Sequence, residues 1–231
     1  MTASAKRVLS QAVEDYLKAI YKLQAHGEAV STTGLARRLG TSPAAVTKMV
    51  KQLAQLRLID HTPYYGARLT PSGEKAALEI IRHHRLLELY LHEALGYGWD
   101  EVDAEAEKLE HHISEEFEDR IDRMLGSPRH DPHGDPIPTR DGEVEPPRGR
   151  SLAESAEGDR LVILRVRDSD PSVLRYLDRL GMRLAVVLEV TEVQPFSGPI
   201  TLRIAGETHS IGRELAGHVF VERCGEGGND A

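Results

Sequence analysis

The segment AEKLEHHISEE, residues 106–116, contains four glutamates and two histidines within eleven residues. Carboxylate oxygens and imidazole nitrogens are ordinary protein ligands for divalent metal ions. If residues 99–125 form one helix, about 100° of rotation per residue places five polar positions along a single stripe. These are Asp103, Glu107, Glu110, His111 and Ser114, beside an apolar stripe of Val102, Ala106, Leu109, Ile113 and Phe117. His112, Glu115 and Glu116 are expected on the outer side.

Acidic residues at the edge of a buried face need an opposite charge, because unpaired carboxylates there repel one another and lose hydration. That charge comes either from a metal ion or from a basic side chain such as Arg82 or Arg85. Spacing alone leaves a metal site and a salt-bridged acidic face both open.

Two other segments offer ligands of the same kind. HHRLLE contains His84 and Glu88, four residues apart on one expected helix face, and an antiparallel helix pair could join them to the acidic stripe. The first expected helix adds Glu14 and Asp15. His83 is expected at the surface, because its neighbour His84 has the partner at the helical spacing.

The elements that must position these residues follow from periodicity and capping signals. Helices are expected within 10–26, 31–40 and 41–57, followed by a hairpin within 58–70 around Tyr-Tyr-Gly. This order is that of a winged helix-turn-helix. Long helices are then expected within 70–95 and, as one unbroken helix, within 99–125.

Charge is divided unevenly along the 231 residues, whose net charge is −8. Residues 1–75 contain 11 basic and 5 acidic side chains, whereas residues 76–125 contain 5 and 14. A basic first third on an acidic chain indicates a nucleic-acid surface confined to one domain. No apolar run approaches the roughly 18 residues of a membrane span, and we expect a cytoplasmic protein. The single cysteine, Cys224, excludes an intrachain disulfide and a thiolate-rich zinc site.

The helix that starts at TSPAAVTKMVKQ is the candidate for reading DNA, with its apolar stripe facing the core. Hydroxyl groups, small apolar groups and lysines would face outward, and arginines and tyrosines from the preceding helix and the wing would add backbone contacts. The candidate DNA-binding residues are Arg37, Arg38, Ser42, Pro43, Ala44, Thr47, Lys48, Lys51, Tyr64, Tyr65 and Arg68. The alternative is a helix-turn-helix that binds protein.

Residues 126–158 are rich in Pro, Gly and charge, which indicates a linker or irregular loop. From Asp159 the pattern changes to five short strands and one short helix, typical of a small β-barrel. The expected fold is mainly α with a small β part: a winged helix-turn-helix at 1–73, a helical domain at 74–140, a linker at 141–158 and a barrel at 159–224. A disordered tail is expected at 225–231.

Six stretches, taken together, resemble the DtxR/MntR family of metal-dependent transcriptional repressors. They are VEDYLKAIYKL, ARRLGTSPAAVTKMVKQL, LTPSGEKAAL, IIRHHRLLELYL, AEKLEHHISEE and DPHGDPIP. The resemblance covers residues 10 to about 140, and the later strands resemble the family's SH3-like, FeoA-type domain. It implies a homodimer that binds an operator in double-stranded DNA, with no enzyme activity, no small-molecule substrate and no membrane partner.

The resemblance also implies the metal ligands. The primary site would consist of Asp15, Glu107, Glu110 and His111, and the secondary site of His84, Glu88 and Asp103. Asp131 and His133, in DPHG, are candidate extra ligands, and Asp168 and Asp170 are candidates in the later domain that cannot be aligned closely. Lys18 stands where some manganese-responsive members have a third acid, which argues against a two-metal cluster of that kind. A histidine usually stands at the position of Asp103.

The implied metal is Mn²⁺, because iron-responsive members carry Met and Cys where this chain has Asp15 and Glu107. A sulfur-free, carboxylate-rich set also suits a hard ion. Fe²⁺ is the alternative, and Zn²⁺, Co²⁺ or Cd²⁺ could bind in vitro. We therefore expect a Mn²⁺-activated repressor of metal-uptake genes. The rivals are an iron(II)-responsive relative, a metal-independent winged-helix regulator, and a di-metal enzyme, which leaves the basic helix-turn-helix unexplained.

Overall fold

The computed structural model describes residues 9–24, 28–62, 64–167 and 170–224. Its chain forms two compact units. The first consists of residues 1–84, 110–113 and 138–143, and the second of 85–109, 114–137 and 144–231. The two units are described separately. The predicted tail, 225–231, and Asp168 lie outside the described residues.

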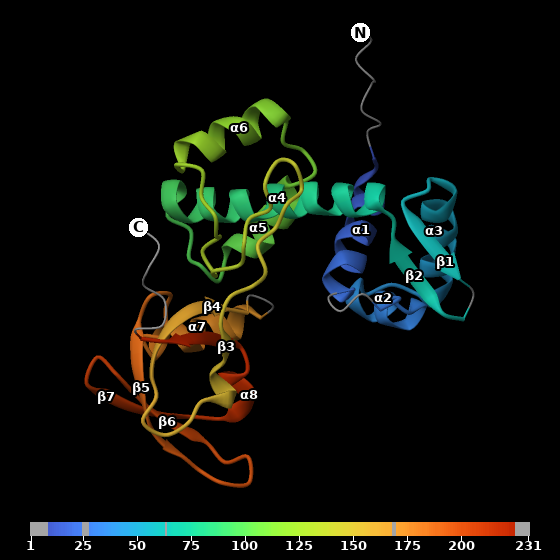
Figure 1. The fold of residues 1–231 in the computed structure, drawn as a ribbon. Coiled ribbons are helices and arrows are strands. Elements are labelled where there is room, and N and C mark those ends of the chain that lie inside the picture. Colours follow the sequence, from blue (N-terminus) through green and yellow to red (C-terminus); the bar gives the residue numbers. More distant parts are fainter. Residues whose placement is uncertain (1–8, 25–27, 63, 168–169, 225–231) are drawn as a thin grey trace. The chain divides into compact units, whose positions relative to one another are not determined.

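The first unit opens with the predicted winged helix-turn-helix (Figure 1). Its elements are α1 (Gln11–Leu23), α2 (Thr32–Arg38), α3 (Pro43–Gln55), β1 (Ile59–Thr62) and β2 (Gly66–Leu69). Serine hydroxyls begin α2 and α3, as Ser31 accepts from the Gly34 amide at 3.1 Å and Ser42 from the Ala45 amide at 3.2 Å. Pro43 occupies the first turn of α3, where a missing amide proton costs nothing.

The hairpin of β1 and β2 is the wing, and its register pairs Ile59 with Leu69 and Thr62 with Gly66. Gly66 has a φ of 109°, and a Cβ there would lie 2.6 Å from the carbonyl oxygen of Val30. Only glycine allows this close approach. The wing is therefore held against the strand-like residue Val30, whose amide bonds to the carbonyl of Ala67 at 2.8 Å.

A single apolar core joins these elements. Leu17 of α1, Leu35 of α2, and Val46 and Leu53 of α3 are fully buried, and Ile59 of β1 is 2% exposed. Helical periodicity predicts an inward position for Leu17, Val46 and Leu53, and the structure confirms it. The position of α3 thus depends directly on the position of α1.

The helical region departs from the prediction at one point. α4 (Pro71–Leu95) is the expected long helix, but the next expected helix is divided into α5 (Val102–Leu109) and α6 (Glu115–Met124). Ser114 accepts from the Phe117 amide at 3.2 Å and so begins a new helix, whose first turn is acidic. The prediction of one helix over 99–125 is wrong for this reason. The predicted apolar stripe fails from Leu109 onward, because Leu109 and Phe117 are 36% and 41% exposed.

The second unit contains a six-stranded antiparallel sheet in the order β3-β8-β4-β5-β6-β7, which curves around its own core in Figure 1. Its strands are β3 (Arg150–Ser151), β4 (Arg160–Val166), β5 (Val187–Val193), β6 (Ile200–Ile204), β7 (Glu207–Ile211) and β8 (Val219–Arg223). α7 (Pro171–Arg179) is the predicted short helix, and α8 (Arg213–Ala216) follows β7. The five predicted strands are present.

The stretch expected as a linker contributes to this sheet. β3 pairs with β8 and is followed by the 3₁₀ turn η1 (Leu152–Glu154), in which Leu152 is fully buried. Sequence composition concealed this because one buried leucine stands among polar and proline-rich neighbours. Trp99, from the loop before α5, packs in the same core.

The loop 131–137 packs against β4 within the second unit. The Val166 amide bonds to the carbonyl of His133 at 2.8 Å. Gly134 has a φ of 87°, and a Cβ there would lie 2.2 Å from the Leu164 carbonyl oxygen. Among the described residues, no helix is long and apolar enough to cross a membrane.

Candidate metal centre and DNA-binding surface

The first unit brings Asp15, Glu110 and His111 together, with one ligand atom from each within 4.8 Å of the others. Asp15 lies on α1, and Glu110 and His111 lie in the turn that follows α5. His111 Nε2 is 2.9 Å from Asp15 Oδ1 and 3.4 Å from Glu110 Oε1. Three of the four predicted primary ligands therefore face a common point.

Glu14 fixes the orientation of the His111 ring. Its Oε2 lies 2.7 Å from His111 Nδ1, so it accepts the Nδ1 proton and leaves the lone pair on Nε2. The His111 side chain is 2% exposed. Within the described part of the chain, Nε2 makes no hydrogen bond of acceptable geometry. A buried imidazole nitrogen that faces two carboxylates and lacks a donor fits a metal ligand.

Glu110, which is fully buried, has two further partners. Lys18 Nζ donates to its Oε2 at 2.7 Å and its Oε1 at 2.9 Å, and His84 Nδ1 lies 2.5 Å from Oε2. Burial acts to raise the pKa of Glu110, but the His84 hydrogen bond and the Lys18 charge outweigh it, and the pKa lies below its usual value. Glu110 is therefore held as a carboxylate.

His83 corrects a sequence prediction. It was expected at the surface, yet it is 7% exposed and its Nδ1 lies 3.1 Å from the backbone oxygen of Glu110. The helical break at residue 110 exposes this carbonyl to a side-chain donor, which an unbroken helix would not do. His112, by contrast, is exposed as predicted.

The remaining predicted ligands are divided between the two units. Glu88, Asp103 and Glu107 belong to the second unit, whereas His84 belongs to the first. His84 and Glu88 lie one turn apart on α4, 2% and 0% exposed. Asp103 is half-buried in the first turn of α5, and Glu107 is exposed near its end.

The second unit contains a triad of its own: Glu88, Asp131 and His133 offer ligand atoms within 4.8 Å of one another, and all three are buried. His133 Nε2 lies 2.6 Å from the carbonyl oxygen of Trp99, so it donates there and leaves Nδ1 facing Glu88 Oε1 at 3.8 Å. Asp131 and His133, predicted as extra ligands, are thus side by side.

Backbone amides of the loop 131–137 hold the Asp131 carboxylate in place. Its Oδ1 accepts from the amides of His133 at 2.8 Å and Asp135 at 3.0 Å. Its buried Oδ2 makes no hydrogen bond to any described residue and lies 3.5 Å from Arg85 Nε. Burial and the neighbouring Glu88 carboxylate raise the pKa of Asp131 to about 8. Two buried acids beside one imidazole form a second set of candidate oxygen and nitrogen ligands.

The sequence suggested Arg82 or Arg85 as the basic partner of the acidic stripe, and the structure gives Glu110 a different one. Arg85 pairs with Asp131 and, at 3.9 Å, with Asp135, and it donates to the Pro136 carbonyl. The cation on Glu110 is Lys18 instead. Sequence reasoning missed this contact, although Lys18 lies one helical turn after Asp15 and so shares its face of α1.

Every predicted DNA-binding residue is exposed. On α3, Thr47 donates its hydroxyl proton to the Pro43 carbonyl at 2.8 Å, which leaves its oxygen as an acceptor. At the tip of the wing, Tyr64 and Tyr65 are 106% and 79% exposed. Ala45, which the prediction omitted, is exposed beside Ala44. The first turn of α3 is therefore small and mostly apolar, and its lysines come later.

Family models match most of the chain. "Iron dependent repressor, N-terminal DNA binding domain" matches residues 8–67, "Iron dependent repressor, metal binding and dimerisation domain" residues 70–139, and "FeoA domain" residues 150–223. A solved structure described as a manganese-dependent transcriptional repressor in complex with manganese has a TM-score of 0.84 and 41% identity, over 92% of this chain and 100% of that one. The chain belongs to the DtxR/MntR family of metal-dependent transcriptional repressors.

Among further relatives, one is named for iron and another for manganese. The iron-dependent repressor IdeR of Mycobacterium tuberculosis is 29% identical over 93% of this chain and 98% of its own length. The transcriptional regulator MntR of Salmonella typhimurium is 38% identical over 45% of this chain and 66% of its own length. The solved manganese regulator SloR has a TM-score of 0.74 and 32% identity, over 92% of this chain and 98% of that one.

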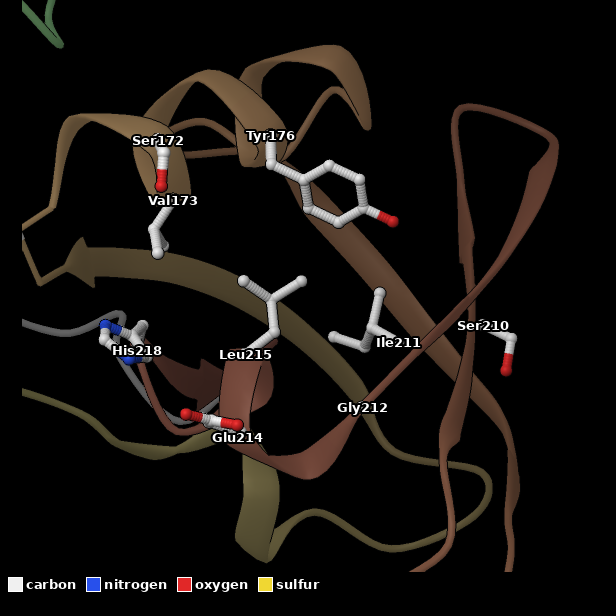
Figure 2. A pocket seen from close by; sticks show the side chains of 9 residues that line it. All are labelled: Ser172, Val173, Tyr176, Ser210, Ile211, Gly212, Glu214, Leu215 and His218. Carbon is white, nitrogen blue, oxygen red and sulfur yellow. The ribbon is translucent and has the colours of Figure 1, made fainter.

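The repressor has the DNA-binding, dimerisation and FeoA domains of its family, and its partners are operator DNA and a second copy of itself. Its FeoA domain also has a hollow of 440 Å³ between α7, β7 and α8. Figure 2 shows Tyr176, Ile211 and Leu215 around it, with the polar groups of Glu214 and His218 at one side. None of the candidate metal ligands lines this hollow.

Proposed function

We propose that this repressor is activated by Mn²⁺ and represses genes of metal uptake as a cytoplasmic homodimer, with no enzyme activity. The observation that carries the proposal is the triad of Asp15, Glu110 and His111, in which the Glu110 and His111 side chains are buried and Asp15 is half-buried. Its donors are oxygen and nitrogen only, and the one cysteine, Cys224, is an exposed residue after β8. Such a set suits Mn²⁺ better than a softer ion. Relatives named for manganese support the same choice.

The primary ligands are proposed to be Asp15, Glu107, Glu110 and His111. His84, Glu88 and Asp103 remain the proposed secondary set, with Asp131 and His133 as additional ligands. The buried group of Glu88, Asp131 and His133 supports a second site in which Glu88 is shared with the loop 131–137. The functional domains are proposed at 1–73, 74–140 and 159–224, close to the ranges of the matching family models.

A bound divalent ion would neutralise the Asp15 and Glu110 carboxylates and accept the lone pair of His111 Nε2. Glu14 holds a ring proton on Nδ1, which orients the ring with Nε2 toward the two carboxylates. Asp15 lies on α1, and α1 shares one core with α2 and α3. Fixing α1 therefore fixes the recognition helix α3.

In a dimer, two copies of α3 must match successive major grooves, about 34 Å apart. A ligand favours that arrangement only if it binds the arrangement more tightly than the alternatives. The proposed activation is therefore a coupling between metal binding and DNA binding, for which 5- to 150-fold changes in affinity are typical. On α3, Lys48 and Lys51 would contact phosphates, and Pro43 and Ala44 would contact bases. On the wing, Tyr64, Tyr65 and Arg68 would contact the DNA backbone.

The test compares two adjacent histidines. His111→Ala removes a proposed ligand, whereas His112→Ala removes an exposed neighbour and is the matched control. The probe is a duplex that wild-type protein selects from a random library in the presence of Mn²⁺, followed by fluorescence anisotropy under anaerobic conditions. We expect His112→Ala to keep the metal response and His111→Ala to lose it while remaining dimeric.

A metal response that persists in His111→Ala would reject the site. The same titration with Fe²⁺ and Zn²⁺ separates the manganese proposal from its iron alternative. The chain is an iron-responsive member of the family if Mn²⁺ does not activate DNA binding and Fe²⁺ does so at a free concentration below the one that the cell maintains.

A further inference from the structure

The turn between β5 and β6 places an aromatic side chain in solvent. Phe196 is 100% exposed. It has a φ of 56° and Ser197 a φ of 60°, and the Gly198 amide closes the turn on the Pro195 carbonyl at 3.0 Å. Two central residues at positive φ form the tight hairpin turn that Asn and Gly usually occupy. Phe196 thus stands in an unfavourable conformation and adds no packing to its own domain, which points to a contact outside the chain.

The residues around Phe196 indicate what kind of partner it contacts. No charged side chain stands between residues 193 and 202. A DNA partner would require basic groups to neutralise its phosphates, so this turn fits an apolar site on a protein instead. The amides of Phe196 and Ser197 donate to no other described residue. The tip of the hairpin therefore offers one aromatic ring and two backbone donors.

The hollow of the FeoA domain has the complementary features. Tyr176, Ile211 and Leu215 form its apolar wall, and Glu214 and His218 lie at one side (Figure 2). Nδ1 of His218 is buried and has no hydrogen-bond partner in the part of the chain that the structure describes. A buried nitrogen of this kind calls for a partner. The hollow, of 440 Å³, is therefore an apolar site with hydrogen-bond acceptors at its edge.

We propose that Phe196 of one copy binds in the hollow of the FeoA domain of a second copy. The ring packs on Tyr176 and Leu215, and the amides at the tip donate to the Glu214 carboxylate and to His218 Nδ1. Since Phe196 is 100% exposed, it does not fill the hollow of its own domain. Apolar ring meets apolar wall, and donors meet acceptors.

This contact is additional to the dimerisation that the family provides. Both of its halves lie within residues 150–223, which match the FeoA domain, whereas the dimerisation domain matches residues 70–139. One aromatic side chain buries too little surface to hold two free molecules together. The contact therefore forms where copies are already at high local concentration, within a dimer or between dimers on one DNA molecule.

The experiment is photo-crosslinking of the full-length protein. Copies with p-benzoylphenylalanine in place of Phe196 are mixed with copies labelled with heavy nitrogen, left to exchange subunits, and irradiated with and without the selected DNA duplex and Mn²⁺. Mass spectrometry then identifies the peptides that are joined. We expect crosslinks from residue 196 to the segments 172–176 or 210–218 of the heavy copy. The same photoreactive residue in place of Tyr64, which is as exposed, is the control and should not reach the hollow.

Two further variants separate a docking role from a structural one. Tyr176→Ser in the heavy copy should lower the yield of crosslinks from residue 196 about fivefold or more, and Tyr65→Ser, at another exposed tyrosine, should not. Phe196→Asn suits the positive φ, so it should keep or raise the thermal unfolding midpoint.

Crosslinks from residue 196 that stay within one copy, or that miss the hollow, would overturn the inference. A lower unfolding midpoint in Phe196→Asn would also overturn it, because Phe196 would then serve its own fold. Neither result bears on activation by Mn²⁺, because no residue of the hollow or the turn is a candidate metal ligand.

Discussion

At the scale of single residues, the two nitrogens of His111 have different tasks. Nδ1 gives its proton to Glu14, at 2.7 Å, and Nε2 faces Asp15 and Glu110. Glu14 thereby favours the tautomer with a lone pair on Nε2. If His111 binds the metal as proposed, Glu14 is a positioning residue, because it would act on the metal only through His111.

Glu14→Gln should weaken Mn²⁺ binding by about 10- to 100-fold, the usual effect of removing such an outer partner. The amide can still accept the Nδ1 proton, but it no longer holds it by charge. Competition with a fluorescent metal chelator would measure the affinity. Glu116→Gln, an exposed change on α6, is the control, and equal affinities in the two variants would exclude a positioning role for Glu14.

Residue types and family resemblance located the candidate cluster better than they located the residues around it. Asp15, Glu110 and His111 could be named from spacing and family resemblance, and they meet. Lys18 was recorded only as a departure from a family pattern, and His83 was placed at the surface. Both depend on the position of Glu110, whose side chain and carbonyl lie at the break after α5. The spacing of residues along an assumed single helix does not reveal that the helix ends after Leu109.

At the scale of elements, the exposed face of α3 is apolar in its first turn and basic further along. Its first turn presents Pro43 and Ala44, and its exposed lysines, Lys48 and Lys51, lie one and two turns later. If α3 enters the major groove as proposed, this arrangement gives few direct hydrogen bonds to bases, so apolar contacts and DNA shape would carry more of the specificity. The lysines would contribute affinity that does not depend on sequence.

Lys48→Ala and Lys51→Ala should each weaken DNA binding and reduce its salt dependence. A dimer loses two phosphate contacts per substitution, so the slope of log K against log salt should fall by about 1.8. Anisotropy titrations at several salt concentrations provide the slope. Lys108→Ala, at an exposed position of α5, should leave it unchanged; if all three variants have the wild-type slope, α3 does not contact phosphate through these lysines.

The C-terminal sheet depends on Asp159, which joins three segments. It accepts from the Ala156 amide at 2.9 Å, from Arg150 of β3 at 2.6 Å and from Arg223 of β8 at 3.0 Å. The Ala156 hydrogen bond, followed by the two arginines, lowers the pKa of Asp159 below 3.8. The carboxylate therefore stabilises the fold above that pH, and the contribution is lost as pH falls through the lowered pKa.

Asp159→Asn should lower the thermal unfolding midpoint at pH 7, because one charged acceptor for two arginines is removed. The difference from wild type should shrink as pH falls below 3.8. Circular dichroism melts over pH 3–7 test this. Asp141→Asn, at an exposed position, is the control, and a pH-independent difference for Asp159→Asn would show that its charge is not what stabilises the sheet.

Element boundaries show where sequence reasoning reached its limit. Serine caps and Pro43 were sufficient to place α2 and α3, because those signals are local. Ser114 is a signal of the same kind, but it was read as one position on a continuing stripe. β3 was hidden because its stability comes from pairing with β8, about seventy residues away in sequence, and from the burial of Leu152.

At the scale of the whole molecule, each of the two compact units brings together, among its described residues, one triad of candidate metal ligands. The first holds Asp15, Glu110 and His111, and the second holds Glu88, Asp131 and His133. The triads share no residue, so metal binding at each can be removed separately. The loop of the second triad also packs against β4, which connects that site to the FeoA domain.

Any ligand that binds only the folded state raises its stability, by about 2.7 kcal/mol at a free concentration of 100 times Kd. For a chain of this size that corresponds to a rise of about 5–10 °C in the unfolding midpoint. Calorimetry with and without Mn²⁺ should therefore show stabilisation in wild type and in the control His112→Ala. His111→Ala should lose the part that belongs to the first unit, and His133→Ala the part that belongs to the second. If the variant with both changes is stabilised as much as wild type, Mn²⁺ binds elsewhere and neither triad is its site.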